Sequence, residues 1–281
     1  MMGGNDQQAY DRGTSLFSPD GRIYQVEYAR EAVSRGAPSL GVRTADGVVF
    51  VAMSRATSSL MEAESIEKLH KLDDHLGTAS AGHVADARQL IDLARRQAQG
   101  NRLRYGEPVG VETLTKFVTD HIQENTQRGG TRPYGAALLI GGIDDGEPRL
   151  FAADPSGTPN EWKATVIGGG RSTIQGVFED DWESDLSLTE GIELGISALA
   201  EHDDEFDPAD LAVATITEAD GYRPVPEDEV ADAYAAAGLG TEESSEGDDA
   251  AADDESDTDS AADDESNTDS AADDESNDTA E

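Results

Sequence analysis

Hydrophobic residues recur every three or four positions between residues 22 and 35, which is the period of an amphipathic helix. The apolar stripe consists of Ile23, Val26, Ala29 and Val33, and the opposite face carries Tyr24, Glu27, Tyr28 and Glu31. Gly36 is expected to end this helix in a left-handed conformation. A helix of about a dozen residues is marginal alone in water, so the stripe needs a packing partner. That partner is either its own domain or another subunit.

The remaining apolar runs predict a layered α+β domain. Short β-rich runs predict strands at Ser39–Thr44, Val48–Ser54, Ile66–Leu72, His75–Ala81, Gly135–Ile143, Pro148–Asp154, Trp162–Gly168 and Leu211–Thr217. Helical periodicity covers His83–Gln99, Gly110–Gln127, Leu188–Glu201 and Glu227–Ala236. Gly100 and the pair Gly129-Gly130 are expected to end the first two of these helices. Paired strands, helices, paired strands and helices in this order fit α+β layers better than βαβ units.

The two ends of the chain lack this patterning. Residues 1–8 are polar, and we expect them to be mobile. From Thr241 the chain repeats AADDESDTDS, AADDESNTDS and AADDESNDTA, a composition that cannot bury a face. We therefore expect a disordered acidic tail, acting either as a solvating brush or as a docking surface.

Charge and composition narrow the function further. The chain carries 60 acidic and 20 basic residues, and 19 of the acids lie after position 240, so the body is strongly acidic too. Such self-repulsion needs screening by salt, which predicts a salt-loving source. The lack of basic clusters argues against nucleic acid and membrane surfaces, and the start is no signal peptide, so the cytoplasm is expected. Without cysteine there is no disulfide, thiolate zinc site or cysteine nucleophile.

The N-terminal sequence contains motifs that are similar to those of a known family. The segments Tyr10-Asp11-Arg12, Phe17-Ser18-Pro19-Asp20-Gly21-Arg22 and Gln25-Val26-Glu27-Tyr28-Ala29 resemble the signature of proteasome α subunits, and residues 8–239 are similar to the archaeal form. The resemblance implies the four-layer αββα sandwich of N-terminal nucleophile hydrolases. It divides the chain into a gate segment (1–13), a domain (14–240) that includes the helix 22–35, and the tail (241–281). It also implies that this helix packs around a ring axis, with its apolar side against sister protomers.

The resemblance further implies a subunit without catalysis. Active β subunits of the family use a processed N-terminal threonine, and Ala37 stands near that place with no hydroxyl. Ser80 lacks the glycine of a nucleophile elbow. Gly168-Gly169-Gly170 lacks the lysine of a phosphate loop and is expected to be a strand-to-helix turn. The side chains of His70, Asp73, Asp74 and His75 suggest a metal only weakly, so we predict no metal and no cofactor. The rivals are a β-type threonine peptidase and an acidic-tailed binding protein.

Lys68 is the strongest candidate binding residue. The ordinary expectation for it is a surface lysine paired with a nearby acid. In the family, the matching lysine lines a pocket between adjacent α subunits and pairs with the C-terminal carboxylate of an AAA+ ATPase, a role that suits a flexible ammonium group. The resemblance places around this pocket Gly21, Arg22, Arg35 and Gly36.

The resemblance also implies a gate and partners. The residues matching the gate cluster are Tyr10, Asp11, Arg12, Pro19 and Tyr28, and those matching the pore loop are Arg128, Gly129 and Gly130. Local capping of the helix entrance by Tyr10 and Asp11 is the alternative. Arg128 replaces an aromatic residue often found there, so pore width and charge preference do not carry over. The implied partners are other α subunits in a heptameric ring, β subunits, the AAA+ ATPase and unfolded protein substrates in transit.

Overall fold

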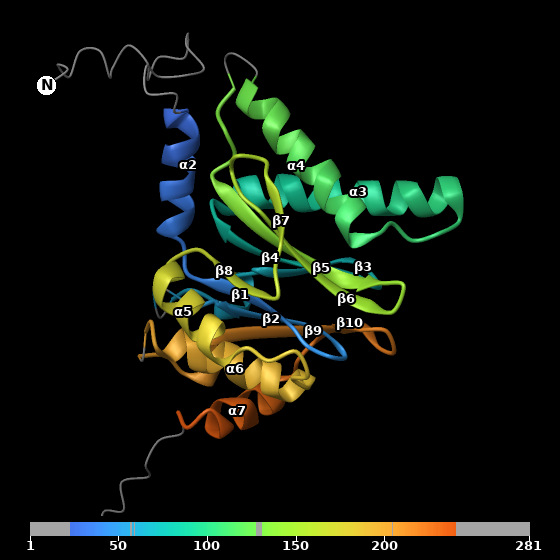
Figure 1. The fold of residues 1–281 in the computed structure, drawn as a ribbon. Helices are drawn as coiled ribbons and strands as arrows, with labels where there is room; N and C mark the ends of the chain where they lie inside the picture. Colours follow the sequence, from blue (N-terminus) through green and yellow to red (C-terminus); the bar gives the residue numbers. More distant parts are fainter. Residues whose placement is uncertain (1–22, 57, 59, 128–130, 204, 240–281) are drawn as a thin grey trace, which may run out of the picture. The chain divides into compact units, whose positions relative to one another are not determined.

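Two five-stranded antiparallel sheets lie face to face, and helices cover the outer face of each one (Figure 1). The computed structural model describes residues 23–56, 58, 60–127, 131–203 and 205–239. In the first sheet the strand order is β10-β9-β2-β1-β8, and in the second it is β3-β4-β5-β6-β7. The predicted αββα sandwich is therefore correct.

The strands of the first sheet are β1 (Ser39–Arg43), β2 (Gly47–Met53), β8 (Ala164–Ile167), β9 (Leu211–Thr217) and β10 (Gly221–Pro224). Those of the second sheet are β3 (Leu69–Asp73), β4 (Leu76–Gly82), β5 (Ala136–Asp144), β6 (Glu147–Ala153) and β7 (Pro159–Glu161). The helices are α2 (Tyr24–Ser34), α3 (Val84–Tyr105), α4 (Val111–Gln127), α5 (Arg171–Asp181), α6 (Leu188–Ala200) and α7 (Glu227–Ala236). Two short 3₁₀ turns lie at Ala63–Ser65 and Pro208–Asp210.

Three apolar cores separate the four layers. The middle core lies between the sheets and contains Phe50 and Leu150, with α2 contributing Val33. A second core joins the β3–β7 sheet to α3 and α4, which supply Leu90 and Leu114. The third joins the β1-containing sheet to α5, α6 and α7. Among the helices of the described residues, none is long and apolar enough to cross a membrane.

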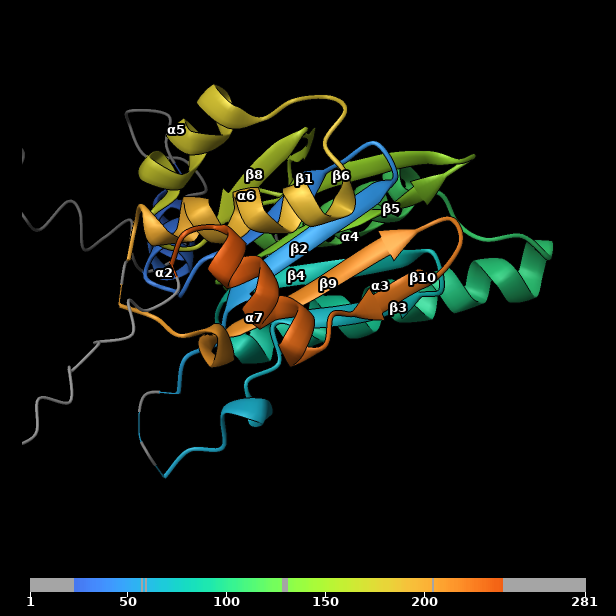
Figure 2. The same ribbon diagram turned by 90° about the horizontal axis from the view of Figure 1, so that it is seen from below.

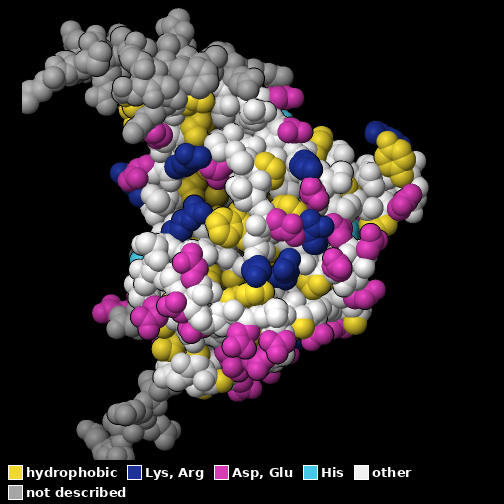
Figure 3. Space-filling model, in the orientation of Figure 1, with side chains coloured by type: hydrophobic (Ala, Val, Ile, Leu, Met, Phe, Trp, Pro, Cys, Tyr) yellow, Lys and Arg dark blue, Asp and Glu magenta, His cyan; other side chains and the backbone are white. Residues whose placement is uncertain are grey.

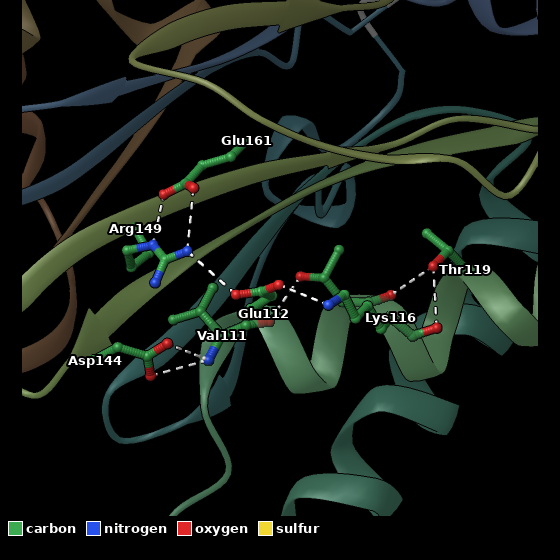
Figure 4. Close-up of polar contacts among 8 residues, drawn as sticks. Val111, Glu112, Lys116, Thr119, Asp144, Arg149 and Glu161 are labelled. Carbon is green, nitrogen blue, oxygen red and sulfur yellow. Dashed lines mark hydrogen bonds and ion pairs between the residues drawn. The ribbon is translucent and has the colours of Figure 1, made fainter.

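A polar network fixes the start of α4 against the sheet (Figure 4). Both carboxylate oxygens of Asp144, at the end of β5, accept a hydrogen bond from the Val111 N–H, at 3.0 and 2.9 Å. A carboxylate there satisfies an unpaired donor and suits the positive end of the helix. Arg149 on β6 joins Glu161 on β7 to Glu112 on α4. The network therefore ties one helix to three neighbouring strands.

Two helix ends differ from the prediction. The helix expected to end at Gly100 continues to Tyr105, where Gly106 takes the left-handed conformation with φ 78°. Nothing lies within 4 Å of a Cβ built on Gly100, so this glycine costs the helix some stability without ending it. Gly36 is not left-handed either, because the last turn of α2 closes at Arg35 in the right-handed region.

Several short elements were not predicted from the sequence pattern. The run predicted at Trp162–Gly168 contains β8, whereas β7, which ends just before this run and belongs to the other sheet, was not predicted. Neither β10 nor α5 was predicted, although Gly168-Gly169-Gly170 was expected as a turn into a helix, and α5 does begin there. These elements are three to eleven residues long, too short for a clear period.

The apolar stripe of α2 packs on its own chain, and the expectation that it packs against sister protomers is wrong. Val26, Ala29 and Val33 are buried, and the helix contacts β4 and β5. Its other face stays at the surface, where Tyr24 and Tyr28 stack with ring centres 6.5 Å apart. A face of α2 that meets another subunit is therefore the polar and aromatic one.

Candidate functional site

The C-terminal end of α2 meets the start of β1 and the end of β4 at Gly36. A Cβ on Gly36 would lie 2.8 Å from the backbone nitrogen of Gly82, closer than real Cβ atoms come. The carbonyl of Gly36 accepts a hydrogen bond of 2.7 Å from Gly169. Close backbone approach, and not a left-handed conformation, is therefore what requires glycine at position 36.

Lys68 lies beside this junction. Its Nζ donates a hydrogen bond of 2.6 Å to the carbonyl oxygen of Ala37. Within the described residues, no carboxylate lies within ion-pair distance of this ammonium group, so the expected pairing with a nearby acid is wrong. Burial lowers the pKa of Lys68 to about 8, because the charged form loses hydration that no counter-ion replaces.

The hydroxyl groups near Ala37 are engaged in structure. Ser39 is fully buried and its Oγ donates to the carbonyl of Ser80 at 2.8 Å. The Oγ of Ser80 donates in turn to the carbonyl of Lys68 at 3.3 Å. Both serines therefore brace the strands around Lys68.

The other expected pocket residues divide into two groups. Arg35 adjoins Gly36, but its guanidinium forms an exposed ion pair of 3.1 Å with Glu31, as the helical spacing predicts. Gly21 and Arg22 lie outside the described residues. The structure thus brings Gly36 and Lys68 together through Ala37. It places Arg35 next to them and does not test Gly21 and Arg22.

Most of the gate and pore residues also lie outside the described residues. This group comprises Tyr10, Asp11, Arg12, Pro19, Arg128, Gly129 and Gly130, as well as the whole tail 241–281. Tyr28 is described, and it is 48% exposed on the outer face of α2.

An anchor for the expected pore loop was missed in the sequence. Arg132 directs two nitrogens to the buried carboxylate of Asp86 on α3, at 2.6 and 2.7 Å. The Gly135 N–H donates to the same carboxylate at 2.8 Å. The hydrogen bond from Arg132 holds the pKa of Asp86 below its ordinary value. Asp86 and Arg132 are 46 positions apart, so local sequence gives no signal of this pair.

The acidic and histidine residues of the β3–β4 hairpin have protein partners. Asp73 accepts from Arg102 at 3.1 Å, and Asp74 pairs with Lys71 at 2.7 Å. His75 bonds the Val109 carbonyl through Nε2 at 2.9 Å. Across the described part of the chain, no three His, Cys, Asp or Glu side chains group as a metal site requires.

Comparison with known proteins gives two family models and several close relatives. The proteasome subunit model matches residues 33–216, and the model for the A-type N-terminal signature of proteasome subunits matches residues 10–32. Proteasome subunit alpha 2 of Haloferax volcanii is 62% identical over 91% of this chain and 97% of that protein. Proteasome subunit alpha 1 of Haloarcula marismortui is 63% identical over 77% and 84%. Proteasome subunit alpha of Halobacterium salinarum is 58% identical over 82% and 91%.

Proposed function

Because the chain belongs to the proteasome subunit family, as an alpha-type member similar to those of salt-loving archaea, we propose that its copies form the heptameric outer ring of a 20S core particle. This ring templates assembly of the β ring and gates the entry of unfolded protein substrates. The proposed parts are the gate segment 1–13, the domain 14–240 and the acidic tail 241–281. The assembly works in the cytoplasm.

In this proposal the subunit itself is not a peptidase. The position expected for the nucleophile is Ala37, which has no hydroxyl, and its amide nitrogen continues into the chain toward α2. An N-terminal nucleophile needs both a side-chain nucleophile and a free amine as base. Intact mass of the purified chain tests this. A mature chain that begins at Ala37 or Ser39 would support the rival β-type peptidase.

Lys68 is the proposed anchor for the C-terminal carboxylate of an AAA+ ATPase. The observation that carries this proposal is an ammonium group held by a carbonyl, with two further donors and no acidic partner among the described residues. In so acidic a chain, an uncompensated cation is a distinctive landing point for an anionic chain end. Gly36, Arg35, Gly21 and Arg22 complete the proposed pocket.

The proposed gate consists of Tyr10, Asp11, Arg12, Pro19 and Tyr28, with Arg128, Gly129 and Gly130 bordering the pore. Binding of the ATPase tail would favour the open arrangement of the gate only through contacts made better in that arrangement. Removal of residues 2–12 should then raise peptide entry into assembled core particles without any ATPase. Unaltered peptide hydrolysis would rule out a gate made of these residues.

The variant Lys68→Ala tests the proposed anchor. It should abolish ATPase stimulation of peptide hydrolysis and leave ring assembly intact, because the ammonium group bonds only the Ala37 carbonyl among the described residues. Lys116→Ala is the matched control, since Lys116 forms an ordinary exposed pair of 2.7 Å with Glu112. Full stimulation of the Lys68→Ala particle would refute the anchor.

A further inference from the structure

A hollow of about 270 Å³ opens beside α2 on one flank of the sandwich (Figure 3). Its lining includes the apolar residues Val33, Ala137, Ala152, Trp162 and Ile167. A cavity of about 150 Å³ holds a benzene-sized molecule, so this hollow has room for two aliphatic side chains.

The rim of the hollow favours an acid. Arg30 and Arg171 both line it, and Arg30 already pairs with Asp154 at 2.7 Å. Arg171 is exposed, and within the described residues no carboxylate pairs with it. As the first residue of α5 it also stands at the positive end of a helix, where a cation is unfavourable. A carboxylate next to Arg171 would relieve both conditions.

The connection from β2 to β3 projects on the side of the sandwich away from α5 and β8 (Figure 2), and we call its exposed residues Leu60, Met61 and Glu62 the knob. The connection from β2 to β3 carries Leu60, which is 94% exposed, and Met61, which is 46% exposed. Leu60 is the most exposed large hydrophobic residue among those the structure describes. Glu62 follows directly and is also exposed. Leu60 and Met61 together expose more contiguous apolar surface than a single scattered residue does, and such a surface is available for a contact.

Knob and hollow also lie at the same end of the sandwich. The β2–β3 connection begins where the Met53 N–H bonds the Pro38 carbonyl, and it ends where Lys68 bonds the Ala37 carbonyl. Residues 37 and 38 come directly after α2, whose Val33 and Ser34 line the hollow. In a ring, each subunit meets the next through two different surfaces. The knob and the hollow satisfy that requirement, because they lie on opposite flanks at the same end of the sandwich.

We propose that Leu60 and Met61 of one copy insert into the hollow beside Trp162 of the next copy, where Glu62 pairs with Arg171. This inference rests on the proposed ring and names the contact that closes it. The apolar side chains of Leu60 and Met61 fill the hollow, and the carboxylate of Glu62 reaches its rim.

Disulfide trapping tests the contact, because the chain has no cysteine of its own. The double variant Leu60→Cys with Ala152→Cys should give a ladder of covalent oligomers up to the ring size on mild oxidation. The control pair Leu103→Cys with Ala152→Cys should give no ladder, since Leu103 is 88% exposed near the far end of α3. Microscopy of the same samples reports whether rings are present.

The outcomes separate the two proposals. Rings without the Leu60–Ala152 ladder would overturn this contact and leave the ring standing. No rings and no ladder would overturn both. Equal ladders from the control pair would mean random collision, and the contact would again be wrong.

A charge exchange tests the polar part of the contact. Glu62→Arg and Arg171→Glu should each raise the concentration for half-assembly about tenfold, because each places like charges together at the seam. Glu62→Arg combined with Arg171→Glu should recover assembly to within about threefold of the natural chain. No effect in any of the three variants would overturn the ion pair.

Discussion

At the scale of residues, the two most informative contacts are long-range. The sequence and the family resemblance single out Lys68, but its acceptor, the Ala37 carbonyl, lies 31 positions away. The expected acidic partner is absent among the described residues because the fold turns this ammonium group toward backbone. The charge of Lys68 is therefore balanced only by a carbonyl dipole, which does not fully offset its desolvation. A bound carboxylate would stabilise the charged form.

The lowered pKa of Lys68 predicts a pH-dependent affinity for anionic chain ends. Below about pH 7 the ammonium group is almost fully charged and the affinity should be flat, and the affinity should fall about tenfold between pH 7 and pH 9 as the proton is lost. Because the folded pKa lies below the unfolded one, the same group makes the fold more stable as pH rises from about 8. Calorimetric titration of an ATPase tail peptide at constant salt measures the affinity. A flat profile, as expected for Lys68→Arg, would exclude Lys68 as the anchor.

The pair Asp86–Arg132 predicts a large effect from a residue that is mostly exposed. Arg132→Met should lower the free energy of unfolding by about 2–3 kcal/mol, because it leaves a buried carboxylate with only the Gly135 N–H. The depressed pKa of Asp86 contributes stability at neutral pH that is lost on acidification. The difference from the natural chain should therefore shrink below about pH 4 in chemical denaturation.

Arg223→Met is the matched control for this measurement. Arg223 binds Glu229 with two hydrogen bonds, but both side chains are exposed, so its loss should cost less than about 1 kcal/mol. Equal losses from the two variants would contradict the special role given to burial of Asp86.

At the scale of elements, periodicity predicted the long helices and strands but not the surfaces on which they pack. The stripe of α2 is visible in the sequence, yet no pattern tells whether it packs on its own domain or on another subunit. It packs on β4 and β5, because Gly36 and Gly82 allow the backbones to approach closely. Short elements such as β7 and β10 depend on tertiary pairing and carry little signal of their own.

Gly36→Ala should loosen α2 from the sandwich. The added Cβ meets the backbone at Gly82, so the free energy of unfolding should fall by about 1–3 kcal/mol. Gly100→Ala is the control: it lies inside α3 with open space around it, and it should gain about 0.5–1 kcal/mol. Hydrogen exchange of α2 amides in the two variants distinguishes the effects. Unchanged protection of α2 in Gly36→Ala would show that the junction tolerates a side chain.

At the scale of the whole molecule, acidity dominates. The tail holds 19 of the 60 acidic residues, and the body keeps 41 acids against 20 bases. The acidic composition predicted a salt-loving source, and the similar proteins do come from salt-loving archaea. The N-terminal sequence motifs predicted the family. The proposed gate segment 1–13 and the tail 241–281 lie outside the described residues.

Thermal unfolding should depend on salt in both the full chain and a chain ending at residue 240. Self-repulsion lowers the melting temperature when salt is removed, and the shorter chain should respond less because it has lost 19 negative charges. Circular dichroism at low and at molar potassium chloride measures both. A shorter chain with no salt dependence would place the whole effect in the tail.

The outer strands of the two sheets have a consequence for how the protein avoids aggregation. The edges are formed by β3, β7, β8 and β10, which are only three to five residues long, whereas β5 at the centre has nine. Pro159 begins β7 and Pro224 ends β10, so each of these edges lacks a backbone donor. Such edges are poor templates for adding a foreign strand. Crowded copies can then associate through side chains into closed, finite particles without growing into cross-β fibres.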